Sequence, residues 1–363
     1  MEKQTIALTG WGSGWHIIPL VSVYNYLKDS EKYNFIWVWE SGQLEEEIAE
    51  KSWIEFHDIA AWKIRRYFDI RNFYEPLKNL TGLFEGIYYI WKYKIDIVFS
   101  KGGFVSLPLS IAALLMRKKI YIHESDIQTG LANRIISKFA TKVFHTFPNT
   151  STNPSPSTSL QGLPLSSKGD KLKKSKYITT GQIVNPELIE GLKSLKVGTN
   201  KRLKVLVIAW SQGSTIIFKN LIKILWDLSH IDFEIILGEQ NLHFRKELDI
   251  FTNTTVYDFV DQKTLWLIYK NTDIAITRGS ATVLWELYYF GIHSIIVPIT
   301  NAGWHQIHNA EFFNKNFESD ILDENVNLSL EMFRKLKAYS ELRKKRLNLD
   351  WLYDALKIIE KEL

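Results

Sequence analysis

A short glycine loop near the beginning of the chain is the first stretch whose residue types could do chemistry. It covers residues 9–16, TGWGSGWH, and lies between a β-rich run at 4–8 and an apolar helical pattern that starts at Ile17. Glycines let backbone N–H groups approach an anion, and the amino end of a helix adds positive partial charge. The loop therefore predicts a phosphate-binding turn, and His16 supplies an imidazole that titrates near neutral pH.

A second loop of the same kind lies in the other half of the chain. Ser211, Gln212 and Gly213 follow a strand-like run at 203–209 and open a helical pattern. Their backbone N–H groups would hold phosphates at a helix amino terminus, although a plain strand-to-helix turn has the same pattern. A polar segment at 123–126 ends another strand-like run, at the edge where open α/β sheets bind ligands.

Alternating strand and helix patterns must position these loops. Strands are expected at 4–8, 35–38, 54–57, 97–100, 120–124 and 143–144, and then at 203–209, 233–237, 256–259, 274–277 and 294–297. Such alternation predicts βαβ units and parallel sheets. We therefore predict an α/β fold in which two Rossmann-like domains face each other across a cleft.

The length of the chain fits two such halves, because 363 residues are too many for one ordinary core. Composition changes sharply at 149–176, where a Ser-, Thr-, Asn- and Pro-rich run precedes a lysine cluster, and this predicts a flexible loop in solvent. We expect an amino-terminal domain at 1–148, a flexible insertion and linker at 149–183, a carboxyl-terminal domain at 184–325 and terminal helices at 326–363.

Composition narrows the functional classes. The chain has no cysteine, which excludes disulfides and thiolate metal sites, and it has no HExxH motif, so we expect neither a metal nor another cofactor. A net charge of +5 suits an anionic substrate or membrane surface and does not require nucleic acid. No apolar run reaches the ~20 residues that span a bilayer, and no signal peptide precedes the first strand, so we expect a cytoplasmic protein.

Basic and aromatic residues are interleaved between 61 and 94. From Lys63 to Tyr74, docking on an anionic bilayer and packing of an amphipathic helix on the sheet both remain open. For the helix near Leu83–Trp91, packing on the sheet is favoured. The candidates for membrane contact are Lys63, Arg65, Arg66, Tyr67 and Phe68.

Taken in order, the motifs resemble those of the MurG family of glycosyltransferases from about residue 4 to residue 320. They are the first glycine loop with HIIP at 16–19, GGFVS at 102–106, HESD at 123–126 with GLAN at 130–133, SQG at 211–213, RGSAT at 278–282 leading to Glu286, and Gln306 with Asn309 and Ala310. The chain departs from the family's NPxR motif at Asn185-Pro186, where Glu187 and Leu188 follow and the arginine is missing. It also departs where His305 stands in place of a glutamine and Phe218 in place of an asparagine.

The resemblance implies a GT-B fold and a metal-independent, inverting transferase. Its donor would be UDP-N-acetylglucosamine, and its acceptor would be N-acetylmuramoyl pentapeptide on undecaprenyl diphosphate, at the cytoplasmic face of the membrane, in peptidoglycan synthesis. Two other interpretations remain open: a GT-B transferase that acts on another membrane lipid, and a catalytically impaired binding protein. Sugar-nucleotide epimerases are more distant relatives.

The same resemblance assigns roles to single residues. Glu286 would accept hydrogen bonds from both ribose hydroxyls, because two carboxylate oxygens suit a vicinal diol. His16 is the candidate base for the acceptor 4-hydroxyl and Asp126 the second candidate, but His16 could equally bind the acceptor diphosphate or cap the helix. The donor-binding candidates are Ser13, Gly14, Asn133, Ser211, Gln212, Gly213, Arg278, Ser280, Ala281, Thr282, Glu286, Gln306 and Asn309, and the acceptor-binding candidates are Gly10, Gly12, Gly102, Gly103, His123 and Glu124.

Tryptophan stands where the family has glycine at positions 11, 15, 39, 53, 62, 210 and 304. An indole is costly where the backbone needs a positive φ or must approach a phosphate closely. We hypothesise that UGA codons, which encode glycine in some bacteria, have been translated as tryptophan. The chain as written is then expected to be catalytically poor, and UGG codons at 11, 15, 210 and 304 would contradict the hypothesis.

Overall fold

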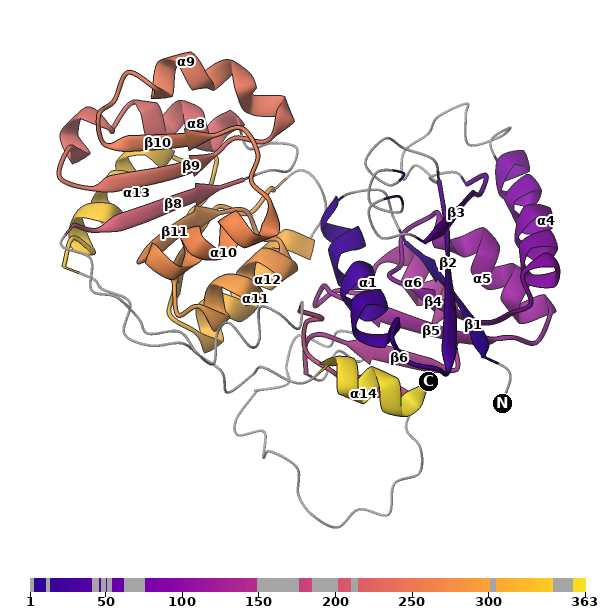
Figure 1. Cartoon of the computed structure of the whole chain (residues 1–363). Coiled ribbons are helices and arrows are strands. Elements are labelled where there is room, and N and C mark those ends of the chain that lie inside the picture. The colour runs from indigo at the N-terminus through magenta and orange to yellow at the C-terminus, as the bar shows by residue number, and fades with distance from the viewer. Residues whose placement is uncertain are drawn as a thin grey trace, which may run out of the picture. The chain divides into compact units, whose positions relative to one another are not determined.

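The chain folds into two compact units, Met1–Pro186 with Tyr353–Leu363, and Glu187–Leu352 (Figure 1). The computed structural model describes residues 3–10, 14–40, 46, 50, 54–61, 76–148, 176–184, 202–209, 215–300, 305–341 and 355–363. Within this part of the chain, no helix is long and apolar enough to cross a membrane.

The first unit is built on a parallel sheet with the strand order β3-β2-β1-β4-β5-β6-β7. The strands are β1 Gln4–Thr9, β2 Tyr33–Trp39, β3 Glu55–Asp58, β4 Ile95–Ser100, β5 Lys119–Glu124, β6 Lys142–His145 and β7 Tyr177–Thr179. The helices are α1 Gly14–Leu27, α4 Pro76–Lys92, α5 Ser106–Leu115, α6 Leu131–Ile136 and α14 Ala355–Glu362.

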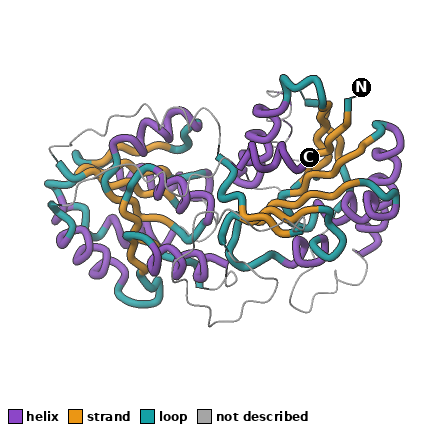
Figure 2. Tube along the Cα trace, turned by 90° about the horizontal axis from the view of Figure 1, so that it is seen from below, coloured by secondary structure: helices purple, strands orange, loops and turns teal. Residues whose placement is uncertain are grey.

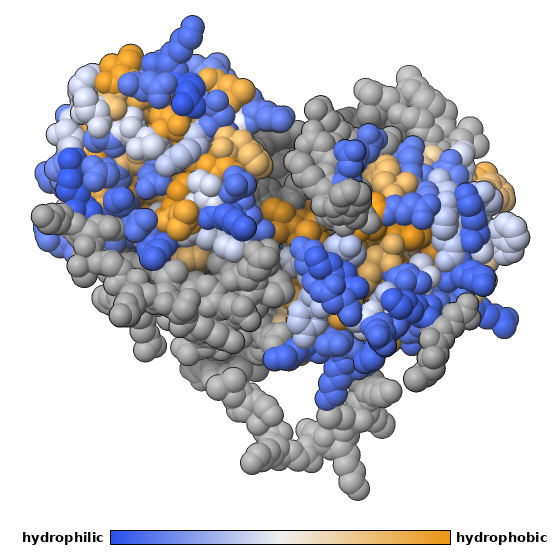
Figure 3. Space-filling model, in the orientation of Figure 1, coloured by the Kyte–Doolittle hydropathy of each residue, from blue (hydrophilic) through white to orange (hydrophobic). Residues whose placement is uncertain are grey.

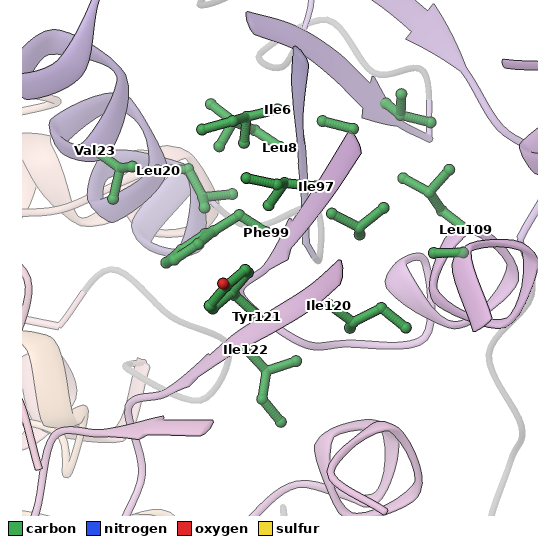
Figure 4. Close-up of a cluster of buried hydrophobic side chains, with 14 of the residues drawn as sticks. Ile6, Leu8, Leu20, Val23, Ile97, Phe99, Leu109, Ile120, Tyr121 and Ile122 are labelled. Carbon is green, nitrogen blue, oxygen red and sulfur yellow. The ribbon is translucent and has the colours of Figure 1, made fainter. Parts of the chain in front are cut away.

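Nearly continuous apolar runs form the central strands, as expected for a parallel sheet that is covered on both faces. Figure 4 shows Ile6 and Leu8 of β1 facing the side of Leu20 and Val23 from α1, and Leu109 of α5 on the opposite side of the sheet. All five side chains are fully buried. The alternation of side chains along each strand therefore serves two helical layers at once.

The second unit repeats the arrangement with the strand order β10-β9-β8-β11-β12-β13. Its strands are β8 Lys204–Ile208, β9 Asp232–Ile236, β10 Thr254–Tyr257, β11 Ile274–Thr277, β12 His293–Ile296 and β13 Ser319–Ile321. Its helices are α8 Thr215–Ile222, α9 Arg245–Leu248, α10 Gln262–Asn271, α11 Ala281–Tyr289, α12 His305–Asn316 and α13 Leu328–Ala338. Helices lie around the strands in each unit (Figure 2).

Both sheets have the doubly wound order of Rossmann folds, in which the winding reverses between the first and fourth strands. The reversal lies between β1 and β4 in one unit and between β8 and β11 in the other. Ligands of such sheets bind outside the carboxyl ends of the strands at this reversal. The predicted α/β fold with two Rossmann-like parallel sheets is confirmed.

The limits of the units differ from the expected boundaries at two places. Strand β7 falls within the predicted linker at 149–183 but pairs with β6 in the first sheet, while residues 149–175 lie outside the described residues. The predicted group of terminal helices, 326–363, is divided, because α13 belongs to the second unit and α14 to the first. Leu356 and Ile359 of α14 are buried in the first core, and Lys142 forms a 2.9 Å ion pair with Glu362.

Helix α4 packs on the first unit as expected for the segment Leu83–Trp91, and it also has an apolar side that was not predicted. One side packs as expected: Ile90 is buried, and a Cβ on Gly86 would lie 3.0 Å from that of Ala112 in α5. The other side carries a second apolar stripe, which is exposed and consists of Leu80, Phe84, Tyr88 and Trp91. Figure 3 shows apolar side chains among hydrophilic ones on the surface of this unit.

Candidate functional site

Three glycines shape the carboxyl edge of the first sheet. Gly10 follows β1, and a Cβ there would lie 2.7 Å from the Trp39 ring and 3.1 Å from the Lys101 Cβ. Gly102 and Gly103 follow β4 with φ values of +88° and +86°, which side chains rarely adopt. A Cβ on Gly102 would also lie 2.5 Å from the Asn133 amide. Side chains of the same unit therefore approach the backbone closely at this edge, and glycine is the residue that fits at Gly10 and Gly102.

Glu124, at the end of β5, holds the next turn together. Its Oε1 accepts the Asp126 N–H at 3.1 Å, and its Oε2 accepts the Gly130 N–H at 3.1 Å and the Asn133 amide at 2.9 Å. Burial and the Asp126 carboxylate raise the pKa of Glu124, and the three hydrogen bonds oppose the shift. Both oxygens are occupied within the chain, so the geometry supports a positioning role for Glu124 and for Asn133, which were predicted to contact substrates.

His123 is likewise held inside the unit. Its Nδ1 accepts a 2.6 Å hydrogen bond from the Lys101 ammonium, so its Nε2 carries the proton that it donates to the Gly181 carbonyl at 3.2 Å. Burial, followed by the charge of Lys101, lowers the pKa of His123 well below its ordinary value. His123 is therefore a neutral structural link at physiological pH.

Lys101 is a site residue that sequence reasoning missed. It is buried, and its ammonium also donates to the Ser125 hydroxyl. Burial lowers the pKa of Lys101, while Glu124 and Asp126 raise it. The sequence did offer one indication of this position, because Lys101 directly precedes the glycine pair at the end of a strand-like run. Asp126 lies half-buried in the turn after β5, next to this group.

The carboxyl edge of the second sheet carries the donor candidates that the structure describes. Ser280 precedes α11 with extended backbone and makes no side-chain cap, and Ala281 and Thr282 form the first turn. The amino end of a helix carries positive partial charge, which suits an anion. Helix α11 ends at Tyr289, and Gly291 follows with φ +66°, so the predicted glycine stop is present.

Glu286 lies in the second turn of α11 and is buried. Its Oε2 accepts a 3.1 Å hydrogen bond from the hydroxyl of Tyr269 in α10. Burial raises the pKa of Glu286 to about 8, against the effect of this hydrogen bond. A glutamate in this state can change its charge near neutral pH, which is common at functional sites.

Arg278, Gln306 and Asn309 are held by their own unit. Arg278 donates to the Val297 carbonyl and to Glu324, both at 2.8 Å. The Gln306 side-chain oxygen accepts the Gly279 and Ile299 N–H groups, each at 3.2 Å, and Asn309 donates to the Gly279 carbonyl at 3.0 Å. These side chains fix the turns after β11 and β12, a function that their sequence motifs did not reveal.

The remaining candidates fall wholly or partly outside the described residues. Gly14, Trp15 and His16 are placed only as the first residues of α1. Trp39 is described, and its indole is buried against Gly10 without a hydrogen-bond partner in the described part of the chain. The positions outside are Gly12, Ser13, Ser211, Gln212, Gly213, Lys63, Arg65, Arg66, Tyr67 and Phe68, with Trp11, Trp53, Trp62, Trp210 and Trp304. Among the residues that are described, no group of His, Asp and Glu side chains could hold a metal ion.

Two family models match the chain, one for each unit. The glycosyltransferase family 28 N-terminal domain matches residues 6–145, and the C-terminal domain of the same family matches residues 204–349. The crystal structure of Acinetobacter baumannii MurG superposes with a TM-score of 0.71 at 20% identity, covering 99% of both chains. A UDP-GlcNAc 2-epimerase from Neisseria meningitidis has the same fold, with a TM-score of 0.63 at 14% identity over 99% of both chains.

Curated relatives match over almost their whole length. A protein from Clostridium botulinum is 34% identical over 95% of this chain and 93% of its own length. One from Clostridium kluyveri is 33% identical over 92% and 90%. Both are named UDP-N-acetylglucosamine--N-acetylmuramyl-(pentapeptide) pyrophosphoryl-undecaprenol N-acetylglucosamine transferase. The two matched domains and this identity show that the chain belongs to glycosyltransferase family 28, in its MurG branch, and has the GT-B fold.

Proposed function

We propose that the protein transfers N-acetylglucosamine from UDP-N-acetylglucosamine to the N-acetylmuramoyl pentapeptide carried on undecaprenyl pyrophosphate. The observation that carries the proposal is the identity to transferases of this name along nearly their full length. The structure supports it with a glycine turn at the edge of one sheet and a helix amino terminus without a side-chain cap at the edge of the other. Both are suited to phosphate groups.

The second unit supplies the donor side of the proposal. The first turn of α11, with Ser280, Ala281 and Thr282, would bind the UDP pyrophosphate, together with the loop 211–213 predicted from the sequence. Glu286 would accept the two ribose hydroxyls once it is ionised. Negative charge grows on the departing UDP as the bond from its phosphate to sugar C1 breaks, and backbone N–H groups would stabilise it.

The first unit supplies the acceptor side. Gly10, Gly102 and Gly103 would receive the acceptor pyrophosphate, and Gly12 extends this loop in the sequence. The acceptor 4-hydroxyl forms the new bond to C1 and gives its proton to a base. His16 and Asp126 are the candidates for this base.

The exposed stripe of α4 would place the protein on the cytoplasmic face of the membrane, where the lipid-linked acceptor lies. Phe84 and Trp91 are 63% and 71% exposed, and Lys92 and Lys94 follow at the end of the helix. An apolar stripe bordered by lysines suits an anionic bilayer surface. This extends the predicted membrane contact from residues 63–68 to a surface that the structure describes.

Transfer itself is tested with radiolabelled UDP-N-acetylglucosamine and the undecaprenyl pyrophosphoryl muramoyl pentapeptide. We expect sugar incorporation into this acceptor, weakly by the chain as written and strongly by a variant with glycine at 11, 15 and 210. Incorporation into glycerolipids instead would favour a transferase for another membrane lipid. Binding of UDP-N-acetylglucosamine without incorporation would favour a binding protein and contradict the proposal.

Changing Phe84 and Trp91 together to serine is expected to lower binding to vesicles that contain phosphatidylglycerol about tenfold, because two large apolar side chains are removed from the contact. Co-sedimentation measures the bound fraction, and added salt should also weaken vesicle binding by the wild-type protein. The matched control is Leu267→Ser, since Leu267 is an apolar side chain of α10 with 62% exposure. Equal loss in the control, or none in the double variant, would contradict membrane docking by α4.

A further inference from the structure

Two turns meet at the carboxyl edge of the second sheet, and a buried ion pair joins them. One turn, 278–280, leads into α11, and the other, 297–300, follows β12. Arg278 belongs to the first turn, and its Nη1 lies 2.8 Å from Glu324 Oε2. The other oxygen of Glu324 accepts the Thr300 N–H at 2.9 Å and the Thr300 hydroxyl at 2.8 Å. One carboxylate therefore fixes both turns.

The ion pair is sequestered from water. The side chains of Arg278 and Glu324 are 3% and 11% exposed. Burial alone would raise the pKa of Glu324, but the hydrogen bonds from Thr300 and Arg278 keep it below its ordinary value. Removing one partner of a buried ion pair strongly destabilises the folded protein, because the other charge stays buried without compensation.

A second link joins the same turns without charge. The Gln306 side-chain oxygen accepts one N–H from each turn, at Gly279 and at Ile299. A Cβ on Gly279 would lie 2.3 Å from the Gln306 carbonyl oxygen, so the turn and the start of α12 are in close contact. The neutral link can hold the turns near each other, while the carboxylate fixes the orientation of the Thr300 peptide.

We propose that Glu324 is a positioning residue for donor binding, which acts through Thr300 and Arg278 to hold the two turns in the conformation that receives the sugar nucleotide. The inference rests on the proposed function, because it assumes that these turns bind UDP-N-acetylglucosamine. Glu324 lies after β13 and belongs to none of the sequence motifs that mark the family. Its role is visible only from the contacts.

The test compares variants of the full chain with glycine at 11, 15 and 210, by titration calorimetry with UDP-N-acetylglucosamine. Glu324→Gln should weaken binding tenfold or more, because the glutamine amide would place an N–H group against the Arg278 guanidinium. Thr300→Val keeps the backbone hydrogen bond and loses the hydroxyl, so a smaller loss of about threefold is expected. Glu331→Gln, at an exposed ion pair with Arg334 in α13, is the control and should bind as before.

A structural role alone is separated from positioning by two measurements. Thr300→Val should leave the melting temperature unchanged while it weakens binding. The double variant R278M/E324L replaces the buried pair by apolar side chains and should melt like the parent, yet still bind weakly. Unchanged donor affinity in Glu324→Gln and in this double variant would overturn the inference, whereas a parent that ignores the nucleotide would overturn the proposed function instead.

Discussion

Replacing Trp11, Trp15 and Trp210 together with glycine is expected to raise kcat/KM for transfer by about 100-fold or more. The three positions lie in the two loops whose backbone N–H groups are assigned to phosphates, and loss of one such donor typically costs two to three orders of magnitude. An indole in these loops would exclude the phosphate and prevent the conformations that glycine allows. Steady-state kinetics with both substrates measure the gain.

The control for this experiment is a tryptophan that belongs where it is. Trp285 in α11 is buried, with its ring centroid 5.1 Å from that of Phe313 and 5.8 Å from that of Phe317. Trp285→Gly should destabilise the second unit by roughly 3–5 kcal/mol, because it leaves a large cavity and puts glycine in a helix. No gain from the triple variant, or UGG codons at these positions in the gene, would contradict the hypothesis of recoded glycines.

Replacing Glu286 with glutamine is expected to weaken UDP-N-acetylglucosamine binding about 10- to 100-fold, as two charge-assisted hydrogen bonds to the ribose are lost. In the parent, affinity should rise between pH 7 and pH 9, because burial raises the pKa of Glu286 to about 8 and only the ionised carboxylate accepts both hydroxyls. Calorimetry at several pH values should show that the rise is absent in Glu286→Gln.

The same substitution should stabilise the empty protein at alkaline pH. A carboxyl whose pKa is raised by folding contributes stability that is complete below its unfolded value of 4.5 and is lost as pH rises through about 8. The loss is roughly 1.4 kcal/mol for each unit of pKa difference. Glutamine does not titrate, so Glu286→Gln should melt higher than the parent at pH 8.5 and lose this advantage at pH 4.5. Glu311→Gln, an exposed position in α12, should change neither property.

The fold could be predicted in most of its parts because its signal is local. Apolar runs such as 97–100 and 274–277 identify buried parallel strands, and glycine-containing turns mark their carboxyl ends. Strand β7 and helix α14 were not assigned correctly, because their membership depends on contacts with residues far away in the sequence. Tyr121 of β5, for example, donates a hydrogen bond to the Glu362 carbonyl.

The sequence predicted where the candidate residues lie in the fold, but it did not predict their hydrogen-bond partners. Glu124, Asn133, Arg278 and Gln306 lie at the expected sheet edges, and each makes hydrogen bonds within its own unit that the sequence did not predict. Motif spacing shows which turn a residue belongs to and does not show which way its side chain bonds. Lys101 and Glu324 were missed for the same reason, since a lysine or glutamate in a sequence is ordinarily a solvated surface residue.

The return of α14 to the first sheet has a consequence for biosynthesis. On a ribosome, the second unit has all its residues available as one uninterrupted stretch, 187–352, as soon as that stretch emerges. The first unit was translated earlier but must wait for residues 355–362 to seal the apolar surface around Leu356 and Ile359. The later-translated unit can thus reach its native state first. Until α14 has been translated, the first unit exposes apolar surface to which chaperones can bind.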